Sequence, residues 1–175
     1  MLDTLVSSKT KLKLLLKFFL NASNTAYLRN LESEFGESTN AIRIELNRFE
    51  ESGLLNSYSE RNKKIFKANT KHPLYPEINS IIRKYIGIDK IIDEIVSRLG
   101  EPDKVWLVGK FARGLNGQEI DLKIKGKVDK AYLEELVKKV ESSISRKLNV
   151  QLIDDAEDIL LESKIEPALL LWSKA

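Results

Sequence analysis

The chain has 175 residues, 42% of them hydrophobic, which is enough for one large or two small cores. It has no cysteine and one histidine, which excludes disulfides and thiolate zinc sites and argues against a histidine metal cluster or a Ser-His-Asp triad. No apolar run approaches the roughly 20 residues that span a bilayer, so we expect a cytoplasmic protein with no membrane partner.

Positive charge is concentrated in the first half of the chain. Residues 1–90 hold 15 Lys and Arg against 10 Asp and Glu, a net charge of +5, whereas residues 91–175 hold 14 against 16, a net charge of −2. A basic segment is the one to test for a polyanionic partner, although a charge of this size is also common on solvated domains.

The first predicted helix runs from about Ser8 to Leu20. Its inward face has the helical spacing of Leu12, Leu15, Leu16 and Phe19. Leu14 and Phe18 lie on the other side, and they indicate either a second burial surface, against a partner subunit or another domain, or two exposed apolar side chains.

Two further helices are predicted around a glycine turn. The second runs from about Thr25 to Phe35, and Gly36 then permits a tight reversal. Ser38 or Thr39 can cap the third helix, TNAIRIELNRFEESG, through a side-chain oxygen. A helix, a short glycine turn and a second helix form a helix-turn-helix arrangement.

The third helix has a polar outward face. Its period places Asn40, Arg43, Ile44 and Asn47 opposite the apolar stripe. Asparagine can pair with adenine, arginine with guanine, and an aliphatic side chain can contact a thymine methyl group, so this face suits the major groove of DNA. The alternative is a solvated face on a structural helix, and the neighbouring elements count against it.

A basic hairpin follows the third helix. After a strand that opens at Leu54, the sequence SYSERNKKIFKA places Arg61, Asn62, Lys63 and Lys64 at a polar tip between strand residues. This pattern predicts a wing whose cations reach phosphates beside the groove. We therefore predict that Asn40, Arg43 and Asn47 face bases. The predicted phosphate contacts are Ser38, Thr39, Arg61, Lys63 and Lys64.

Residues 1 to about 70 resemble the winged helix-turn-helix domain of ArsR-like transcription regulators. The segments that carry the resemblance are STNAIRIELNRFEESGLL and the wing SYSERNKKIFKA. The resemblance implies a homodimer that reads an inverted repeat in double-stranded DNA through the third helix. The metal-sensing thiolates of some such regulators are missing, because the chain has no cysteine.

Residues 71–100 are predicted to form a helical connector. One apolar stripe follows Glu77, Gly87 interrupts the pattern, and a second stripe runs to Leu99. The connector could supply a dimer surface or a simple core. His72, which precedes a proline, is expected to have a structural role in the turn before the first of these helices.

Residues 101–175 are predicted to form a small mixed-sheet domain. The apolar run VWLV predicts a buried strand that ends at Gly109. In EIDLKIKG the alternation places Glu119 and Asp121 on one face of the next strand. A helix from about Lys130 to Arg146, a strand LNVQLI and a last helix from about Ala156 to Trp172 complete the domain.

A strand, a glycine turn and an acid-x-acid strand resemble the minimal nucleotidyltransferase fold, on the segments GKFARG and EIDL. The resemblance implies carboxylates that hold two magnesium ions with a nucleoside triphosphate. Several residues depart from the pattern: Lys110 replaces the serine of the turn, Glu119 replaces the first aspartate, and Gln151 aligns with the last one. A lysine ammonium near the cleft disfavours divalent cations, so Glu119 and Asp121 form at most a degenerate metal site.

Three alternatives remain for this second site. In the first and favoured alternative, Lys110 pairs with Glu119 or Asp121 and neutralises a former active site. In the second, Gly109, Lys110 and Arg113 bind an anionic small-molecule effector. Nucleotidyl transfer is the third.

We thus expect an α+β protein: an N-terminal winged helix-turn-helix plus a small mixed-sheet nucleotidyltransferase-like domain. The predicted function is transcription regulation through DNA binding, with no required cofactor. Magnesium and a nucleoside triphosphate enter only if the second domain is an active nucleotidyltransferase. A protein-interaction adaptor is a further alternative.

Overall fold

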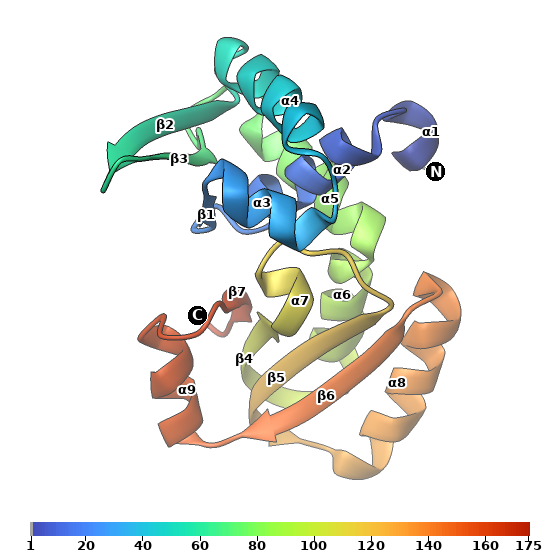
Figure 1. Ribbon diagram of the computed structural model, residues 1–175. Coiled ribbons are helices and arrows are strands. Elements are labelled where there is room, and N and C mark those ends of the chain that lie inside the picture. Colours follow the sequence, from blue (N-terminus) through green and yellow to red (C-terminus); the bar gives the residue numbers. More distant parts are fainter. Residues whose placement is uncertain (1) are drawn as a thin grey trace. The chain divides into compact units, whose positions relative to one another are not determined.

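The computed structural model describes residues 2–175, which divide into two units, one ending at Tyr85 and the other beginning at Ile86 (Figure 1). Each unit contains helices and its own β-sheet, so the chain is α+β as expected. The segment predicted as a connector, residues 71–100, is divided between the two units.

The first unit contains a helical layer and a three-stranded antiparallel sheet in the order β1-β3-β2. Its elements are α1 (Leu2–Leu5), α2 (Lys9–Leu15), the π-helical segment η1 (Leu16–Leu20), β1 (Thr25–Ala26), α3 (Leu28–Phe35), α4 (Thr39–Glu51), β2 (Leu55–Glu60), β3 (Lys63–Ala68) and α5 (Tyr75–Ile86), whose last residue crosses the boundary.

The helix formed by α2 and η1 is buried on more than one side. Leu14 and Phe18, which lie off the predicted inward face, have no exposed surface. The alternative that they are exposed on a surface helix is therefore wrong. A helix with apolar side chains on more than one face is typical of a core position, and this one contacts both α4 and β3.

The second predicted helix starts later than expected. Thr25 and Ala26 form β1, which pairs with Lys67 and Phe66 of β3, and α3 begins only at Leu28. The sheet supplies hydrogen-bond partners that a sequence period does not reveal, so tertiary pairing overrides the local helical pattern here. Gly36, with a φ of +64°, ends α3 as expected.

The predicted wing is present as the hairpin of β2 and β3. Glu60 pairs with Lys63, which leaves Arg61 and Asn62 as a two-residue turn, and both have a positive φ. Such a turn matches the right-handed twist of the two strands. At the other end of the sheet, His72 accepts a hydrogen bond from the Leu74 backbone N–H, which confirms its structural role before α5.

The second unit contains a four-stranded mixed sheet in the order β6-β5-β4-β7, in which only the β5–β6 pair is parallel. Its elements are α6 (Ile88–Arg98), β4 (Gly100–Val108), α7 (Gly109–Ala112), β5 (Glu119–Val128), α8 (Lys130–Ile144), β6 (Lys147–Ile153), α9 (Asp155–Glu162) and β7 (Leu169–Ser173).

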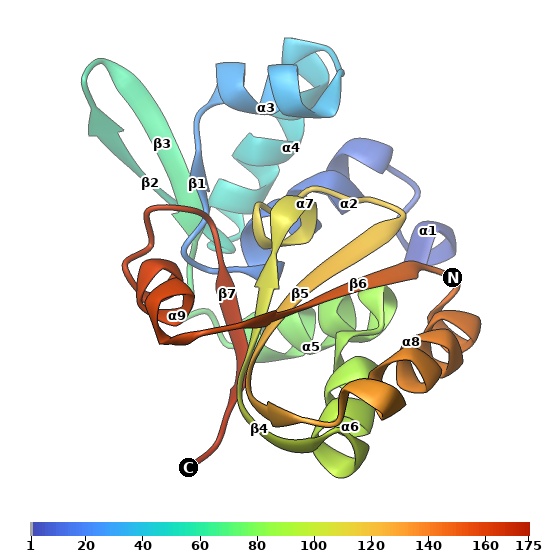
Figure 2. The same ribbon diagram turned by 90° about the horizontal axis from the view of Figure 1, so that it is seen from below.

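Helices pack on both faces of this sheet (Figure 2). The β5 side chains Ile120, Leu122 and Ile124 are buried on the face of α6 and α8. The opposite face carries Asp121 and, on β4, Trp106, which packs with residues of α9. Period-two alternation thus places the acidic pair on the α9 face of the sheet.

The predicted last helix is wrong over its second half. α9 ends at Glu162, Lys164 takes a left-handed φ of 57°, and residues from Leu169 form β7, which pairs with β4. Pro167 lacks the N–H that a continuing helix requires and clashes with the preceding turn. The apolar run after this proline fits a short edge strand as well as a helix.

Candidate functional site

The outward face of α4 is exposed as predicted. Asn40, Arg43, Ile44 and Asn47 all lie on the surface, and Ile44 is 44% exposed. On the opposite face, Ile42 and Leu46 are buried and fix the rotation of the helix about its axis. The polar side chains that were predicted to face bases therefore share one accessible surface.

Ser38 caps the start of α4. Its hydroxyl oxygen accepts a hydrogen bond from the Ala41 backbone N–H at 3.2 Å. Thr39 is the first residue of the helix and is half-buried. The first backbone N–H groups of a helix favour anions, so this end of α4 is compatible with a phosphate contact.

Two of the three predicted wing cations, Lys63 and Lys64, have different environments. Lys63 lies with its Nζ 4.2 Å from the centre of the Tyr27 ring, a cation–π contact. Lys64 donates a hydrogen bond to Glu50 at 2.6 Å. This bond, together with one from Ser57, holds the pKa of Glu50 below its ordinary value. The charge of Lys64 is thus partly neutralised within the protein, which the sequence did not indicate.

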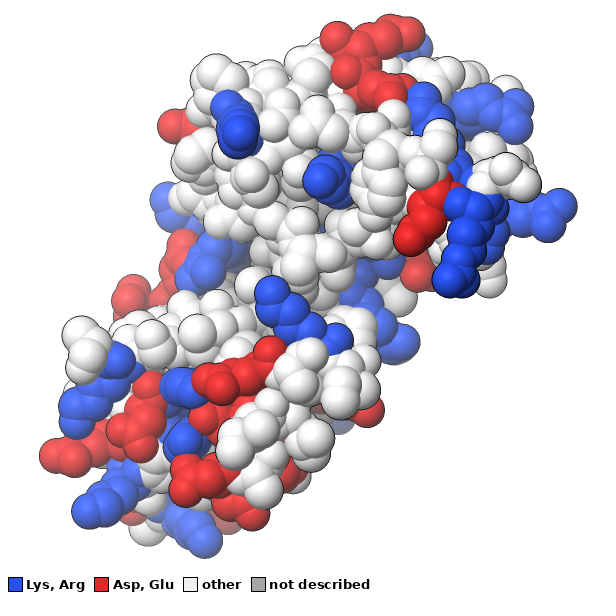
Figure 3. Space-filling model, turned by 90° about the vertical axis from the view of Figure 1, so that its left-hand side faces the viewer, with Lys and Arg blue, Asp and Glu red and all other residues white. Residues whose placement is uncertain are grey.

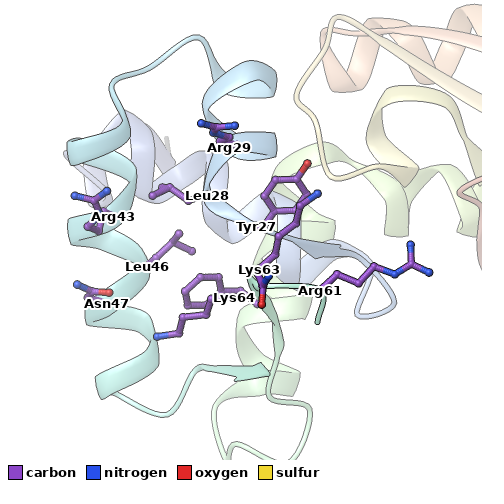
Figure 4. A pocket seen from close by; sticks show the side chains of 11 residues that line it. Tyr27, Leu28, Arg29, Arg43, Leu46, Asn47, Arg61, Lys63 and Lys64 are labelled. Atoms are coloured by element: carbon purple, nitrogen blue, oxygen red, sulfur yellow. The ribbon is translucent and has the colours of Figure 1, made fainter. Parts of the chain in front are cut away.

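A hollow of about 640 Å³ lies between α3, α4 and the wing (Figure 4). Five of its eleven lining residues are Lys or Arg, and none is Asp or Glu. The lining residues are Tyr27, Leu28, Arg29, Arg43, Leu46, Asn47, Arg61, Asn62, Lys63, Lys64 and Phe66. The structure thus brings five predicted DNA contacts, Arg43, Asn47, Arg61, Lys63 and Lys64, to one hollow.

Sequence analysis missed Arg29 as a member of this cluster. It follows Leu28 in the first turn of α3, is exposed, and lines the hollow. The helical period of α3 could have indicated that Arg29 is exposed, because it places Leu31 and Phe35 on the buried side and Arg29 outside it. That signal does not show which outward residues lie near α4 and the wing.

In the second unit, Asp121 packs against the glycine turn. A Cβ added at Gly109 would lie 2.5 Å from Oδ2 of Asp121, and Gly109 has a φ of +70°. Oδ1 of Asp121 accepts a hydrogen bond from the side-chain amide of Asn149 at 2.9 Å. The turn and the aspartate are therefore adjacent.

The structure shows which residues lie beside the predicted acidic pair. The residue paired with Asp121 on β6 is Asn149, whereas Gln151 is paired with Lys123. Within residues 2–175, no ion pair joins Lys110 to Glu119 or Asp121. The Cδ atom of Lys110 instead lies 3.6 Å from the position of a Cβ at Gly117. Neutralisation of the acidic pair by Lys110 is therefore not seen.

The predicted anion site is divided as well. Gly109 and Arg113 line a hollow of about 400 Å³, to which Lys123 contributes a second cation and Glu166 a carboxylate. Lys110, the third predicted member, does not line it. No group of three or more His, Cys, Asp or Glu side chains placed to hold a metal ion occurs among the described residues.

Acidic side chains of α9 neutralise the lysines on their face of the sheet. The carboxylate of Asp158, 2% exposed, accepts hydrogen bonds from Trp106 at 2.9 Å, Lys104 at 2.8 Å and Lys125 at 3.0 Å. Burial opposes ionisation of Asp158, but these hydrogen bonds outweigh it and hold its pKa below the ordinary value. Figure 3 shows acidic and basic side chains intermixed over this unit.

No helix among residues 2–175 has the length and apolar content needed to cross a bilayer. The sequence matches no protein-family model, and it matches no curated protein.

Several solved structures are similar to part of the chain. A mutant of the toxin–antitoxin pair MntA–HpeT has 19% identity over 50% of this chain and 72% of its own, with a TM-score of 0.41. A predicted DNA-binding transcriptional regulator from E. coli has 21% identity. The match covers 50% of this chain and 84% of the regulator, with a TM-score of 0.37. A candidate nucleotidyltransferase from Sulfolobus solfataricus has 23% identity. The match covers 55% of this chain and 86% of the other, with a TM-score of 0.35. These values give no information about function.

Proposed function

We propose that the first unit binds double-stranded DNA and that the protein regulates transcription. The hollow between α3, α4 and the wing carries this proposal, because α3, α4 and the wing contribute five cations and no acid to its lining, and of these cations only Lys64 has an ion pair within the described residues. Long-range attraction to phosphates requires such an unopposed cluster, and phosphate contacts supply most of the affinity of DNA-binding proteins.

The exposed face of α4 would enter the major groove. α4 has 13 residues and is therefore about 20 Å long, and its outward side chains are those suited to reading base edges. Arg43 and Asn47 would contact bases, while Arg61 and Lys63 would hold phosphates on either side. We further propose a homodimer of the ArsR-like kind, in which two copies of α4 read two half-sites.

The proposal is tested by fluorescence anisotropy with random-sequence duplexes at several salt concentrations. The double variant Arg61→Ala/Lys63→Ala should weaken binding to every duplex and reduce the salt slope by about two. Lys9 and Lys84 are exposed and do not line the hollow, so Lys9→Ala/Lys84→Ala is the control with the same charge change. Equal losses in both double variants would contradict the proposed interface.

Arg43→Ala separates sequence reading from general affinity. Selection of bound duplexes from a random pool should give a preferred sequence for the wild type. The variant should lose discrimination at one position of each half-site, by about 1–3 kcal/mol. A uniform loss over all sequences would instead make Arg43 a phosphate contact. Light scattering of the free protein tests the dimer.

Magnesium-dependent nucleotidyl transfer by the second unit is the competing function. The contact between the Gly109 turn and Asp121 favours it, because the fold to which this segment is similar places a carboxylate beside such a turn. Calorimetry with a nucleoside triphosphate, with and without magnesium, distinguishes the two functions. Magnesium-dependent binding that Asp121→Asn abolishes would support the enzyme.

A further inference from the structure

The floor of the hollow in the first unit is apolar, which DNA binding does not explain. Leu46 and Phe66 are 1% and 4% exposed, and Leu28 and Tyr27 are half-buried. Figure 4 shows Leu28 and Leu46 pointing into the space between α4 and the wing. A duplex presents phosphates, sugars and base edges at such a surface, and most of these groups are polar.

The volume of the hollow suits a small molecule. At about 640 Å³ it falls within the range of roughly 300–1,000 Å³ that is typical of small-molecule sites. Such sites combine mostly apolar walls with a few polar groups that fix the orientation of the ligand. The apolar floor and the cationic rim of this hollow have that composition.

Three rim cations remain available to a ligand, and each comes from a different element. Arg29 lies on α3, Arg43 on α4 and Lys63 on β3, and no ion pair of Arg29 or Arg43 occurs within the described part of the chain. Lys64 is engaged by Glu50, and Arg61 extends away from α4 (Figure 4). Charge complementarity therefore favours an anionic group at the rim above the apolar floor.

We propose that this hollow binds an amphipathic organic anion, with an aromatic or short aliphatic body and one carboxylate, sulfonate or phosphate group. The body would lie against the half-buried Tyr27 and Leu28, above the buried Leu46, and the anionic group would accept hydrogen bonds from Arg29 and Arg43. Because Arg43 and Lys63 are also proposed DNA contacts, the ligand would compete with DNA. The predicted competition rests on the proposed DNA-binding function, whereas the ligand site itself does not.

The ligand class is tested by calorimetric titration of the full chain with three probes. Naphthalene sulfonate carries both required features, sodium sulfate only the charge, and naphthalene methanol only the apolar body. We expect naphthalene sulfonate to bind with a Kd at least tenfold lower than either of the other probes. Equal binding of sulfate, or equal binding of the neutral alcohol, would overturn the proposal.

Variants locate the binding site. Leu28→Asn should weaken naphthalene sulfonate binding at least tenfold. The matched control is Ile81→Asn, because Ile81 is 51% exposed in the same unit and does not line the hollow. Arg29→Gln, at an exposed position, provides a second variant if Leu28→Asn does not fold. Unchanged binding in folded Leu28→Asn or in Arg29→Gln would overturn the assignment.

Competition is measured as duplex affinity with and without saturating naphthalene sulfonate. We expect at least a tenfold loss of duplex affinity in the wild type and a smaller loss in Leu28→Asn. Ligand binding with unchanged duplex affinity would overturn the competition and separate the hollow from the DNA interface. A protein that binds naphthalene sulfonate but no duplex at all would contradict the proposed function and leave the ligand site standing.

Discussion

The cations of two surfaces, one in each unit, have opposite surroundings. In the hollow of the first unit, Arg29 and Arg43 lie among other cations with no carboxylate in the lining. On the α9 face of the second unit, Lys104, Lys123 and Lys125 are each within 4 Å of an acidic residue of α9. The difference in net charge between the two halves of the chain does not describe this contrast. The hollow of the first unit presents unpaired cations to a polyanion, whereas the lysines on the α9 face are neutralised by carboxylates.

The comparison shows that the placement of carboxylates matters more than the number of lysines. The field of an unopposed cluster reaches roughly a Debye length of 8–10 Å into solution, whereas paired charges cancel at short range. Five experiments, in decreasing order of expected effect, test how the two units depend on these charges and contacts.

Asp158→Asn should have the largest effect. The variant removes the carboxylate on which Lys104, Lys125 and Trp106 converge and leaves their donors poorly paired. Because the two lysines reach solvent, we expect a loss of about 2–3 kcal/mol in the free energy of unfolding, measured by urea denaturation. Asp155→Asn is the control, since Asp155 contacts Lys125 but is 85% exposed. Equal losses would mean that burial of Asp158 is unimportant.

The same carboxylate predicts a dependence on pH. The pKa of Asp158 lies below its ordinary value of about 3.8 in the folded protein, so folding favours the ionised form. The stabilisation is therefore complete above about pH 5, and it is lost as the pH falls through the unfolded and then the folded pKa. The stability difference between wild type and Asp158→Asn should shrink only in that acidic range.

Gly109→Ala and Gly36→Ala form a matched pair, one in each unit. Both glycines have positive φ, but a Cβ meets nothing within 4 Å at Gly36, whereas at Gly109 it meets Asp121. We expect a loss of about 1 kcal/mol for Gly36→Ala and about 2 kcal/mol for Gly109→Ala. The additional Asp121→Ala change should reduce the Gly109→Ala penalty. Equal penalties in urea denaturation would contradict the close contact.

Asn149→Asp tests whether the acidic strand can become a metal site. It replaces a hydrogen-bond donor to Asp121 by a second carboxylate, which should cost about 1 kcal/mol at low salt. Magnesium should offset this loss, because carboxylate oxygens are its preferred ligands. Thermal unfolding with and without magnesium measures both effects. Gln151→Glu, opposite Lys123, should gain nothing from magnesium.

Glu50→Gln should have the smallest effect on stability. The pair of Glu50 with Lys64 is largely solvent-accessible, so we expect a loss of about 0.5 kcal/mol or less. The freed Lys64 should increase the affinity for random duplexes and make its salt dependence steeper. Glu32→Gln makes the same charge change at an exposed position in the middle of α3. A larger gain in duplex affinity from Glu32→Gln would contradict this account of the wing.

Local signals predicted the helix-turn-helix and the wing well. Gly36 ends α3, Ser38 caps α4, and Arg61 and Asn62 form the hairpin tip, because each depends on interactions within a few residues of the chain. The outward face of α4 followed from the helical period alone. The alternation of β5 likewise placed Glu119 and Asp121 on one face of the strand.

Other features depend on contacts between distant segments and were missed. Thr25 belongs to a strand because β3 lies beside it, and the run from Leu169 belongs to a strand because β4 offers an edge. The register of two parallel strands, joined through α8, decided that Asn149 lies beside Asp121 and Gln151 beside Lys123. No local spacing encodes such a register.

The sequence by itself determined the periods, the caps and the turns, and thereby the exposed face of α4 and the basic hairpin. Only the tertiary structure decided which charges are neutralised: Glu50 comes to Lys64, and Asp158 comes to Lys104, from 14 and 54 residues away. It also brought Arg29 and the apolar floor together. The physical reason is that backbone preferences act over a few residues, whereas charge pairing and burial act through space.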